Sequence, residues 1–211
     1  MKLRAVIFDY GNVICRPPTQ QQLGDAAELC GFSVDDFVQA FWRKRREYDR
    51  GSDARAYWKD IAESSGRVFD DALIAEMMRR EVDFWGRFDN RVLSWARDLR
   101  SAGLRTGILS NLPRTLGEML RSEPGFLGHF DQVTFSYELG FIKPEAPIYQ
   151  HAIEGLGVEP AEALFLDDRP ENVEGARAAG IHAVVFDSWE KFLERDCLRY
   201  GLPRPEKRDG D

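Results

Sequence analysis

The chain has 211 residues, of which 43% are hydrophobic and 12% aromatic, and its formal net charge is −7. This composition excludes a chain that is disordered throughout, and the length suits one large domain or one domain that carries an insertion. The acidic balance argues against nucleic acid as the main partner, because phosphate backbones are bound by basic surfaces.

Cysteine usage and apolar patterning indicate the compartment. Cys15, Cys30 and Cys197 are scattered and have no CxxC spacing, so they form neither a metal framework nor an evident disulfide framework. The apolar run near the N-terminus lacks a cleavage-site pattern, and no segment approaches the roughly 18 apolar residues of a membrane span. The sequence therefore predicts a cytoplasmic protein that does not enter a membrane.

The first half of the chain predicts one strand followed by helices. Residues 3–8 are an apolar run that ends at Asp9, which predicts a buried strand with an acid at its end. From about residue 19 to 86 the pattern is helical, with apolar residues at i, i+3, i+4 and i+7 spacing. This region is divided into about four predicted helices by the glycines Gly31, Gly51 and Gly66.

From about residue 89 onward, predicted strands and helices alternate. The strands are Leu104–Leu109, Gln132–Phe135, Ala163–Leu166 and His182–Phe186. The helices are Arg91–Ala102, one after Pro113, Ala146–Gly155, Pro170–Ala179 and one from Ser188. This alternation predicts an α/β fold with a parallel sheet covered on both faces, and the Pro-rich, charged end at 201–211 predicts a loose tail.

Polar residues follow several of the predicted strands. They are Asp9, Ser110-Asn111, Lys143-Pro144 and Asp167-Asp168. Each alone is best explained as a turn former, a helix cap or a surface residue. Because the carboxyl ends of parallel strands meet at one edge, the set in this order predicts an active site there, with the helical insertion placed as a lid.

These motifs resemble those of the haloacid dehalogenase (HAD) superfamily of hydrolases. The resemblance rests on Phe8-Asp9-Tyr10-Gly11-Asn12-Val13-Ile14, Leu109-Ser110-Asn111, Lys143-Pro144-Glu145 and the run from Leu164 to Asn172, continuing to Gly175-Ala176. It implies a Rossmann-like core at 1–15 and 89–200 and an inserted α-helical C1 cap at 16–88. The motifs are also similar to those of bacterial phosphatases of the α-D-glucose-1-phosphate phosphatase type.

The resemblance implies a Mg²⁺-dependent phosphatase that acts on a small phosphorylated metabolite, with sugar phosphates as candidates. Asp9 is then the nucleophile that forms an aspartyl-phosphate, while Lys143 neutralises charge and Ser110 and the Asn111 amide bind the phosphoryl group. The implied Mg²⁺ ligands are Asp9, the Gly11 carbonyl, and Asp168 with or through Asp167, and Asn172 orients the acid pair.

Gly11 departs from the pattern of most phosphatases of this superfamily, which carry a second Asp there as general acid. Either the enzyme favours good leaving groups, or a cap side chain supplies the proton. The candidates for such a side chain are Asp49, Glu47 and Tyr48. In the run Arg43-Lys44-Arg45-Arg46, a solvated face is the simple explanation and an Arg that reaches the substrate is the functional one.

Two other functions remain open from the sequence. A dehalogenase would use Asp9 on carbon, but a metal-free site gains nothing from the extra charge of Asp167-Asp168. A binding module would hold a phosphorylated metabolite without turning it over, which the missing acid at Gly11 favours and the retained Asp9 and Lys143 oppose.

Overall fold

The core of the molecule is a five-stranded sheet. The computed structural model describes residues 2–205, and within them the strands pair in parallel in the order β3-β2-β1-β4-β5. The strands are β1 (Ala5–Phe8), β2 (Arg105–Ser110), β3 (Gln132–Phe135), β4 (Ala163–Asp167) and β5 (His182–Val185). The predicted α/β fold with a parallel sheet is therefore confirmed.

The register of the central strands brings their carboxyl ends to one edge. Phe8 pairs with Ile108 of β2 on one side and with Leu166 of β4 on the other. The Asp9 N–H continues this ladder by donating to the Leu166 carbonyl at 2.8 Å. Because the strands run in the same direction, the residues that follow them emerge together at this edge.

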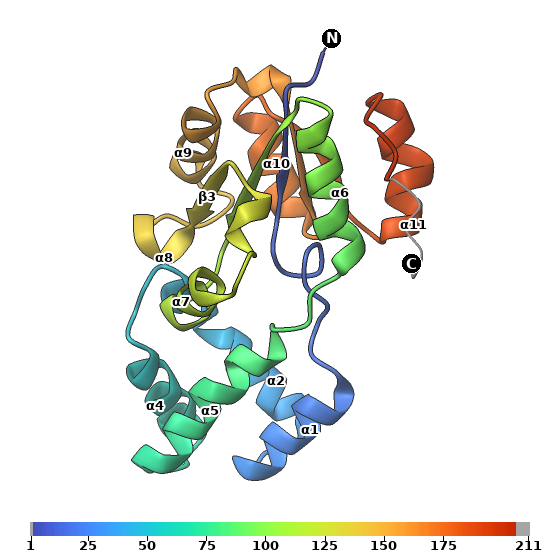
Figure 1. The fold of residues 1–211 in the computed structure, drawn as a ribbon. Coiled ribbons are helices and arrows are strands. Elements are labelled where there is room, and N and C mark those ends of the chain that lie inside the picture. The colour runs from blue at the N-terminus through green and yellow to red at the C-terminus, as the bar shows by residue number, and fades with distance from the viewer. Residues whose placement is uncertain (1, 206–211) are drawn as a thin grey trace.

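Helices cover both faces of the sheet (Figure 1). One face carries α9 (Ala146–Leu156) and α10 (Pro170–Ala178), and the other carries α6 (Asn90–Ser101), α11 (Trp189–Lys191) and the π-helical turn η3 (Phe192–Cys197). Side chains alternate along β1, so Ile7 packs on the first face and Phe8 on the second, where its ring centroid lies 5.7 Å from that of Trp95. Both sides of β1 are thereby buried, as its uninterrupted apolar run predicts.

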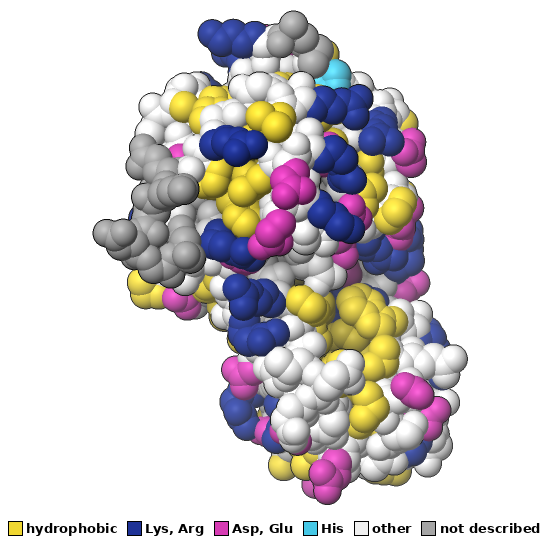
Figure 2. Space-filling model, turned by 90° about the vertical axis from the view of Figure 1, so that its right-hand side faces the viewer, with side chains coloured by type: hydrophobic (Ala, Val, Ile, Leu, Met, Phe, Trp, Pro, Cys, Tyr) yellow, Lys and Arg dark blue, Asp and Glu magenta, His cyan; other side chains and the backbone are white. Residues whose placement is uncertain are grey.

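The insertion between β1 and α6 is helical throughout its regular elements. It comprises α1 (Gln20–Leu29), α2 (Val34–Arg43), α3 (Arg45–Asp49), α4 (Ala54–Ser64) and α5 (Asp71–Phe84). Polar N-caps start four of these helices and accept backbone N–H groups, and they are Thr19, Ser33, Asp53 and Asp70. These helices lie beyond the carboxyl edge of the sheet, and the space-filling view shows two lobes joined at a waist (Figures 1 and 2).

Two predicted boundaries in the helices were wrong. The insertion has five helices rather than about four, because Lys44 takes a non-helical conformation and separates α3 from α2. Helix α9 runs through Gly155 and ends at Gly157, which adopts the left-handed conformation (φ 61°) that glycine accommodates without steric cost. The remaining elements are α7 (Arg114–Ser122), α8 (Ser136–Leu139), and the turns η1 (Leu127–His129) and η2 (Pro160–Glu162).

The start of the predicted tail is packed on the core. Leu202 is buried, and Trp95 Nε1 donates to the Pro203 carbonyl at 2.8 Å, so residues 201–205 are not loose as predicted. The rest of the predicted tail, 206–211, lies outside the described residues.

The helices and the cysteines bear on what the sequence predicts about membrane contact and compartment. Among residues 2–205, no helix is both long and apolar enough to cross a bilayer. Cys15, Cys30 and Cys197 are buried free thiols. The cytoplasmic location stays a prediction.

Candidate active site

Asp9 lies at the end of β1 and is held through one of its two carboxylate oxygens. Oδ1 accepts hydrogen bonds from Ser110 Oγ and from the Tyr10 N–H, each at 2.7 Å, and lies 2.8 Å from Lys143 Nζ. Within residues 2–205, no hydrogen bond or ion pair reaches Oδ2. Asp9 is 6% exposed, so a buried carboxylate is fixed in orientation with one oxygen left open.

Lys143 joins the nucleophile candidate to the acid pair. Its Nζ lies 2.8 Å from Asp9 Oδ1 and 2.6 Å from Asp167 Oδ2, and it also donates to the Leu109 carbonyl at 3.2 Å. Burial alone would disfavour the ammonium, but Asp167 and Asp9 outweigh it and raise the pKa of Lys143. The side chain is therefore a fixed positive charge beside Asp9.

Asn111 holds the loop that carries Lys143. Its side chain accepts from the Lys143 N–H at 2.7 Å and donates to the Lys143 carbonyl at 3.1 Å. These two bonds use one donor and the acceptor of the Asn111 side-chain amide. The geometry gives that side chain a role in positioning Lys143, and the contact of the Asn111 amide with a phosphoryl group stays a prediction.

The acid pair has one inner and one outer member. Asp167 is completely buried, and its oxygens accept from Asn172 Nδ2 at 3.1 Å, from the Arg169 N–H at 2.8 Å and from Lys143. Asp168 is half-buried and accepts from Asn12 Nδ2 at 2.7 Å. Asn172 thus contacts the inner acid, and its role in orienting the pair stays a prediction.

The three carboxylates form a donor set that suits a divalent cation. Asp9, Asp167 and Asp168 each offer an oxygen, and these oxygens lie within 4.8 Å of one another. Burial raises the pKa of Asp9 to about 7; Lys143 opposes that rise, whereas Asp167 and Asp168 add to it. Lys143 balances only one of the three charges, so the residues present fit a hard, oxygen-liganded ion such as Mg²⁺.

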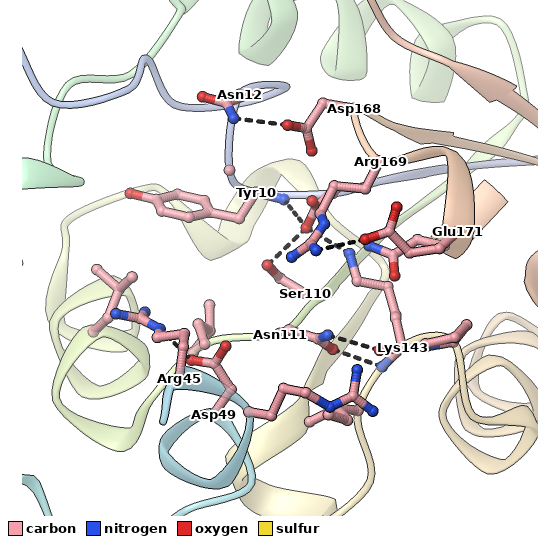
Figure 3. Close-up of a pocket in the computed structure, with 18 of the residues that line it drawn as sticks. Tyr10, Asn12, Arg45, Asp49, Ser110, Asn111, Lys143, Asp168, Arg169 and Glu171 are labelled. Carbon is pink, nitrogen blue, oxygen red and sulfur yellow. Dashed lines mark hydrogen bonds and ion pairs between the residues drawn. The ribbon is translucent and has the colours of Figure 1, made fainter. Parts of the chain in front are cut away.

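A cavity of about 530 Å³ opens above this edge of the sheet (Figure 3). Its core-side lining includes Asp9, Gly11, Ser110, Asn111, Lys143, Asp168 and Asn172. Residues from the helical insertion close the other side, and they are Trp42, Arg45, Arg46, Asp49 and Trp85. Sequence segments more than 150 residues apart therefore share one cavity.

The structure does not bring every predicted cap residue to the cavity. Arg43 and Glu47 are exposed and lie outside the lining. Arg43 ends α2, and the face of α3 that lines the cavity carries Arg45, Arg46 and Asp49. Tyr48 is buried beneath this face, and its hydroxyl donates to Glu81 at 2.9 Å.

Several lining residues were not given a role from the sequence. Trp42 lies near the end of α2 and Trp85 caps the end of α5, and apolar residues at such positions usually belong to the core. Asn12 and Arg169 lie inside the motifs, but the roles suggested by those motifs belong to neighbouring residues. Their proximity to Asp9 and Asp168 in the motifs was the only available signal for Asn12 and Arg169.

Gly11 lines the cavity without being required there by packing. A Cβ built on Gly11 would meet Trp85 at 3.9 Å, an ordinary contact, and Gly11 does not have a positive φ. Neither backbone conformation nor contact with a Cβ therefore requires glycine at this position.

Comparison with known families identifies the class of protein. A model of the haloacid dehalogenase-like hydrolase family matches residues 3–180. The chain therefore belongs to the haloacid dehalogenase-like hydrolase family and is a hydrolase.

Individual relatives support the same class. The chain is 35% identical over 198 residues to Phosphatase MT3486 of Mycobacterium tuberculosis, covering 89% of this chain and 88% of the relative. Among solved structures, a HAD-family enzyme from Bacteroides thetaiotaomicron in complex with magnesium and inorganic phosphate matches with a TM-score of 0.72 and 19% identity, covering 90% and 98% of the two chains. The L-2-haloacid dehalogenase from Xanthobacter autotrophicus matches with a TM-score of 0.67 and 23% identity, covering 96% and 85%.

Proposed function

We propose that this protein is a Mg²⁺-dependent phosphatase that hydrolyses a small phosphate monoester through an aspartyl-phosphate on Asp9. The observation that carries the proposal is the Asp9 carboxylate, held through Oδ1 beside Lys143 with Oδ2 facing no protein donor among residues 2–205. The phosphatase relative and the magnesium and phosphate in the structural neighbour support it.

In the first step, Asp9 Oδ2 attacks phosphorus and the bond to the leaving oxygen breaks. Ser110 and the Tyr10 N–H keep the carboxylate aimed by holding Oδ1, so little orientational freedom is lost on reaction. Lys143 offsets negative charge on the nucleophile and on the phosphoryl oxygens. Water then attacks phosphorus in the second step and releases Asp9.

Asp9, the Gly11 carbonyl and Asp168 are the residues that would hold Mg²⁺, which supplies positive charge for the phosphoryl oxygens when bound. Asp167 is already saturated by Lys143, Asn172 and the Arg169 N–H, so it acts by fixing Lys143 rather than as a principal ligand.

We further propose that residues 16–88 act as a cap on a core formed by 1–15 and 89–200. The chain leaves the core and returns to it through two neighbouring segments that are hydrogen-bonded to each other. The Arg16 N–H donates to the Arg87 carbonyl at 2.9 Å, and the Asp89 N–H donates to the Ile14 carbonyl at 2.7 Å. Such a paired connection suits a lid over the cavity, and the cap side chains in its lining would select the substrate.

The direct test is hydrolysis of p-nitrophenyl phosphate with Mg²⁺ and with EDTA. We expect turnover that depends on Mg²⁺, followed by a screen of sugar phosphates, nucleotides and small phosphoesters to find the preferred substrate. Release of halide from 2-chloropropionate with no phosphate-ester turnover would favour the dehalogenase alternative. Binding of phosphate esters without either reaction would favour the binding module.

Mg²⁺ affinity should rise with pH and level off above about 7. Below the pKa of about 7 that burial produces in Asp9, a proton occupies the carboxyl and the cation must displace it. The apparent Kd should therefore fall by up to about tenfold per pH unit as pH rises toward 7. Calorimetric titration with MgCl₂ measures this slope, and a flat profile in the wild-type protein would contradict it. Asp9→Asn should weaken binding and remove the slope that this carboxyl contributes.

Trp42 is expected to contribute to binding of the substrate's organic part. It is 46% exposed in the cavity lining, and its ring stands edge-on to Trp85 at a centroid distance of 6.4 Å. Trp42→Ala should raise KM for sugar phosphates by about tenfold and change kcat little, because uniform binding is lost. Leu29→Ala, which removes a similarly exposed hydrophobic side chain outside the lining, is the control. Equal KM values in the two variants would contradict the expectation.

A further inference from the structure

Asp49 occupies the cavity side that faces Asp9 from the helical insertion. It ends α3, is 7% exposed and lines the cavity (Figure 3). Arg45 Nε donates to Asp49 Oδ1 at 2.8 Å, and among residues 2–205 Arg45 is the one side chain hydrogen-bonded to the Asp49 carboxylate. Its Oδ2 therefore has no protein donor in the described chain.

Asp49 shares one guanidinium with a second buried carboxylate. Arg45 also donates to Glu81 Oε1 at 2.6 Å, and Glu81, completely buried, accepts from the Tyr48 hydroxyl at 2.9 Å. Two buried carboxylates thus stand against one positive charge. Since an unbalanced buried charge is costly, a proton on one of them relieves the excess, and Asp49 is the member that reaches the cavity.

Other charged groups around Asp49 do not remove this excess. Burial raises the pKa of Asp49, and Arg45 is the strongest opposing charge, with Lys143 and Arg169 acting from across the cavity. Each of those two already pairs with acids of the core: Lys143 with Asp9 and Asp167, and Arg169 with Glu171. Arg46 lines the same cavity but makes no hydrogen bond or ion pair to Asp49 among residues 2–205. Tyr48 and Tyr57 border the cluster, and both are held neutral because burial raises their pKa.

The backbone of this segment is fixed to the core. The Asp49 carbonyl accepts from Ser136 Oγ at 2.5 Å, and the same hydroxyl accepts from the Leu112 N–H at 3.0 Å. Arg50 pairs with Glu145 and donates to the Gly140 carbonyl at 3.0 Å. Gly51 has a φ of 107°, and a Cβ there would approach the Tyr137 carbonyl to 3.0 Å. Asp49 is thereby positioned by the segments that follow β2 and β3, next to Ser110 at the end of β2.

Resting on the phosphatase activity proposed above, we infer that Asp49 is the proton donor to the leaving group, in place of the acid absent at Gly11. Asp9 attacks phosphorus from the sheet edge, so the leaving oxygen departs toward the insertion, where Asp49 lies. As the bond from phosphorus to that oxygen breaks, the oxygen takes the bonding pair and the Asp49 proton and leaves as an alcohol. The Asp49 carboxylate, stabilised by Arg45, then accepts a proton from the water that attacks the aspartyl-phosphate.

The test is the dependence of kcat/KM on leaving-group pKa, measured with a series of aryl and alkyl phosphates. Asp49→Asn should reduce turnover of alkyl phosphates by about 10²-fold or more while changing p-nitrophenyl phosphate by only about threefold, because a good leaving group needs no proton. Glu47→Gln removes a carboxylate from the same helix outside the cavity and should leave the series unchanged. In Asp49→Asn, a second change, Gly11→Asp, should restore alkyl turnover in part.

The pH profile separates a proton donor from a structural group. Wild-type turnover of alkyl phosphates should fall on the basic side, as Asp49 ionises, and Asp49→Asn should lack that limb. Glu81→Gln removes the competing negative charge, so it should lower the pKa of Asp49 and move the limb to lower pH. An equal loss across all leaving groups in Asp49→Asn, with an unchanged basic limb, would overturn the inference alone. Failure of the wild-type protein to hydrolyse any phosphate ester would overturn the proposed phosphatase as well.

Discussion

Asp9→Asn is expected to abolish phosphatase turnover while leaving the protein folded. The change removes the attacking oxygen, and loss of a covalent nucleophile costs on the order of 10⁴-fold or more in kcat. Asn keeps the shape of the side chain and an oxygen that can accept from Ser110, so the thermal unfolding midpoint should stay close to that of the wild-type protein. Steady-state assays with p-nitrophenyl phosphate and Mg²⁺ measure the loss.

Trapping the intermediate makes this prediction specific to Asp9. Rapid acid quenching with a ³²P-labelled substrate should leave phosphate bound to the wild-type protein and none bound to Asp9→Asn. Ser110→Ala is the matched comparison, because it removes a donor to Asp9 Oδ1 but keeps the carboxylate. It should slow turnover and still accumulate labelled protein. Labelled Asp9→Asn protein, or turnover above about a tenth of the wild-type rate, would contradict a nucleophilic Asp9.

Lys143→Met is expected to reduce both activity and stability. The loss of the charge beside Asp9 should lower kcat/KM by about 10³-fold. The change also leaves the Asp9 and Asp167 carboxylates buried without their shared partner, which should lower the free energy of unfolding by about 3 kcal/mol. Denaturant unfolding and the p-nitrophenyl phosphate assay give the two quantities.

A second variant distinguishes these two effects. Combining Lys143→Met with Asp167→Asn removes the unbalanced inner charge, so stability should largely return while activity stays low. In Lys143→Met alone, Asp9 loses the charge that opposes the effect of burial, so its folded-state pKa lies further above its value in the unfolded chain and the folded protein binds more protons. This part of the stability should be greatest at acidic pH and decrease as pH rises through the raised pKa of Asp9. Recovery of activity in the double variant would argue against an electrostatic role for Lys143 in turnover.

Much of the core could be predicted from local pattern. The apolar run before Asp9 predicted the central strand, because a strand buried on both faces needs apolar side chains at every position. Gly157 shows where local pattern was insufficient: Gly155 and Gly157 are equally plausible helix ends in the sequence, and only the backbone conformation distinguishes them. The short tail segment was misjudged because Pro and charged residues hid the one apolar contact made by Leu202.

The residues of the site could be named from the sequence, but their contacts and orientations could not. Asp9, Ser110, Lys143 and Asp168 were named because each follows a strand or precedes a helix, and parallel topology then brings them to one cavity. The cap contribution could not be resolved in this way. Helical spacing gives the faces of α2 and α3 but not which face turns toward the sheet. Arg43 of α2 and Glu47 of α3 were therefore as plausible as Asp49 until the fold placed them outside the cavity.

Residue type and local periodicity were enough to predict the class of fold and the polar residues at the strand ends, and they show that Gly11 carries no acid. Three features of the site appear only in the folded chain: Asn111 holds Lys143, Lys143 pairs with Asp167, and Asp49 shares Arg45 with Glu81. The physical reason is that hydrogen-bond saturation and charge balance are properties of groups brought together across the fold. No local stretch of sequence contains both partners of the Asn111–Lys143, Lys143–Asp167 or Arg45–Glu81 contact, because these partners lie 32, 24 and 36 residues apart.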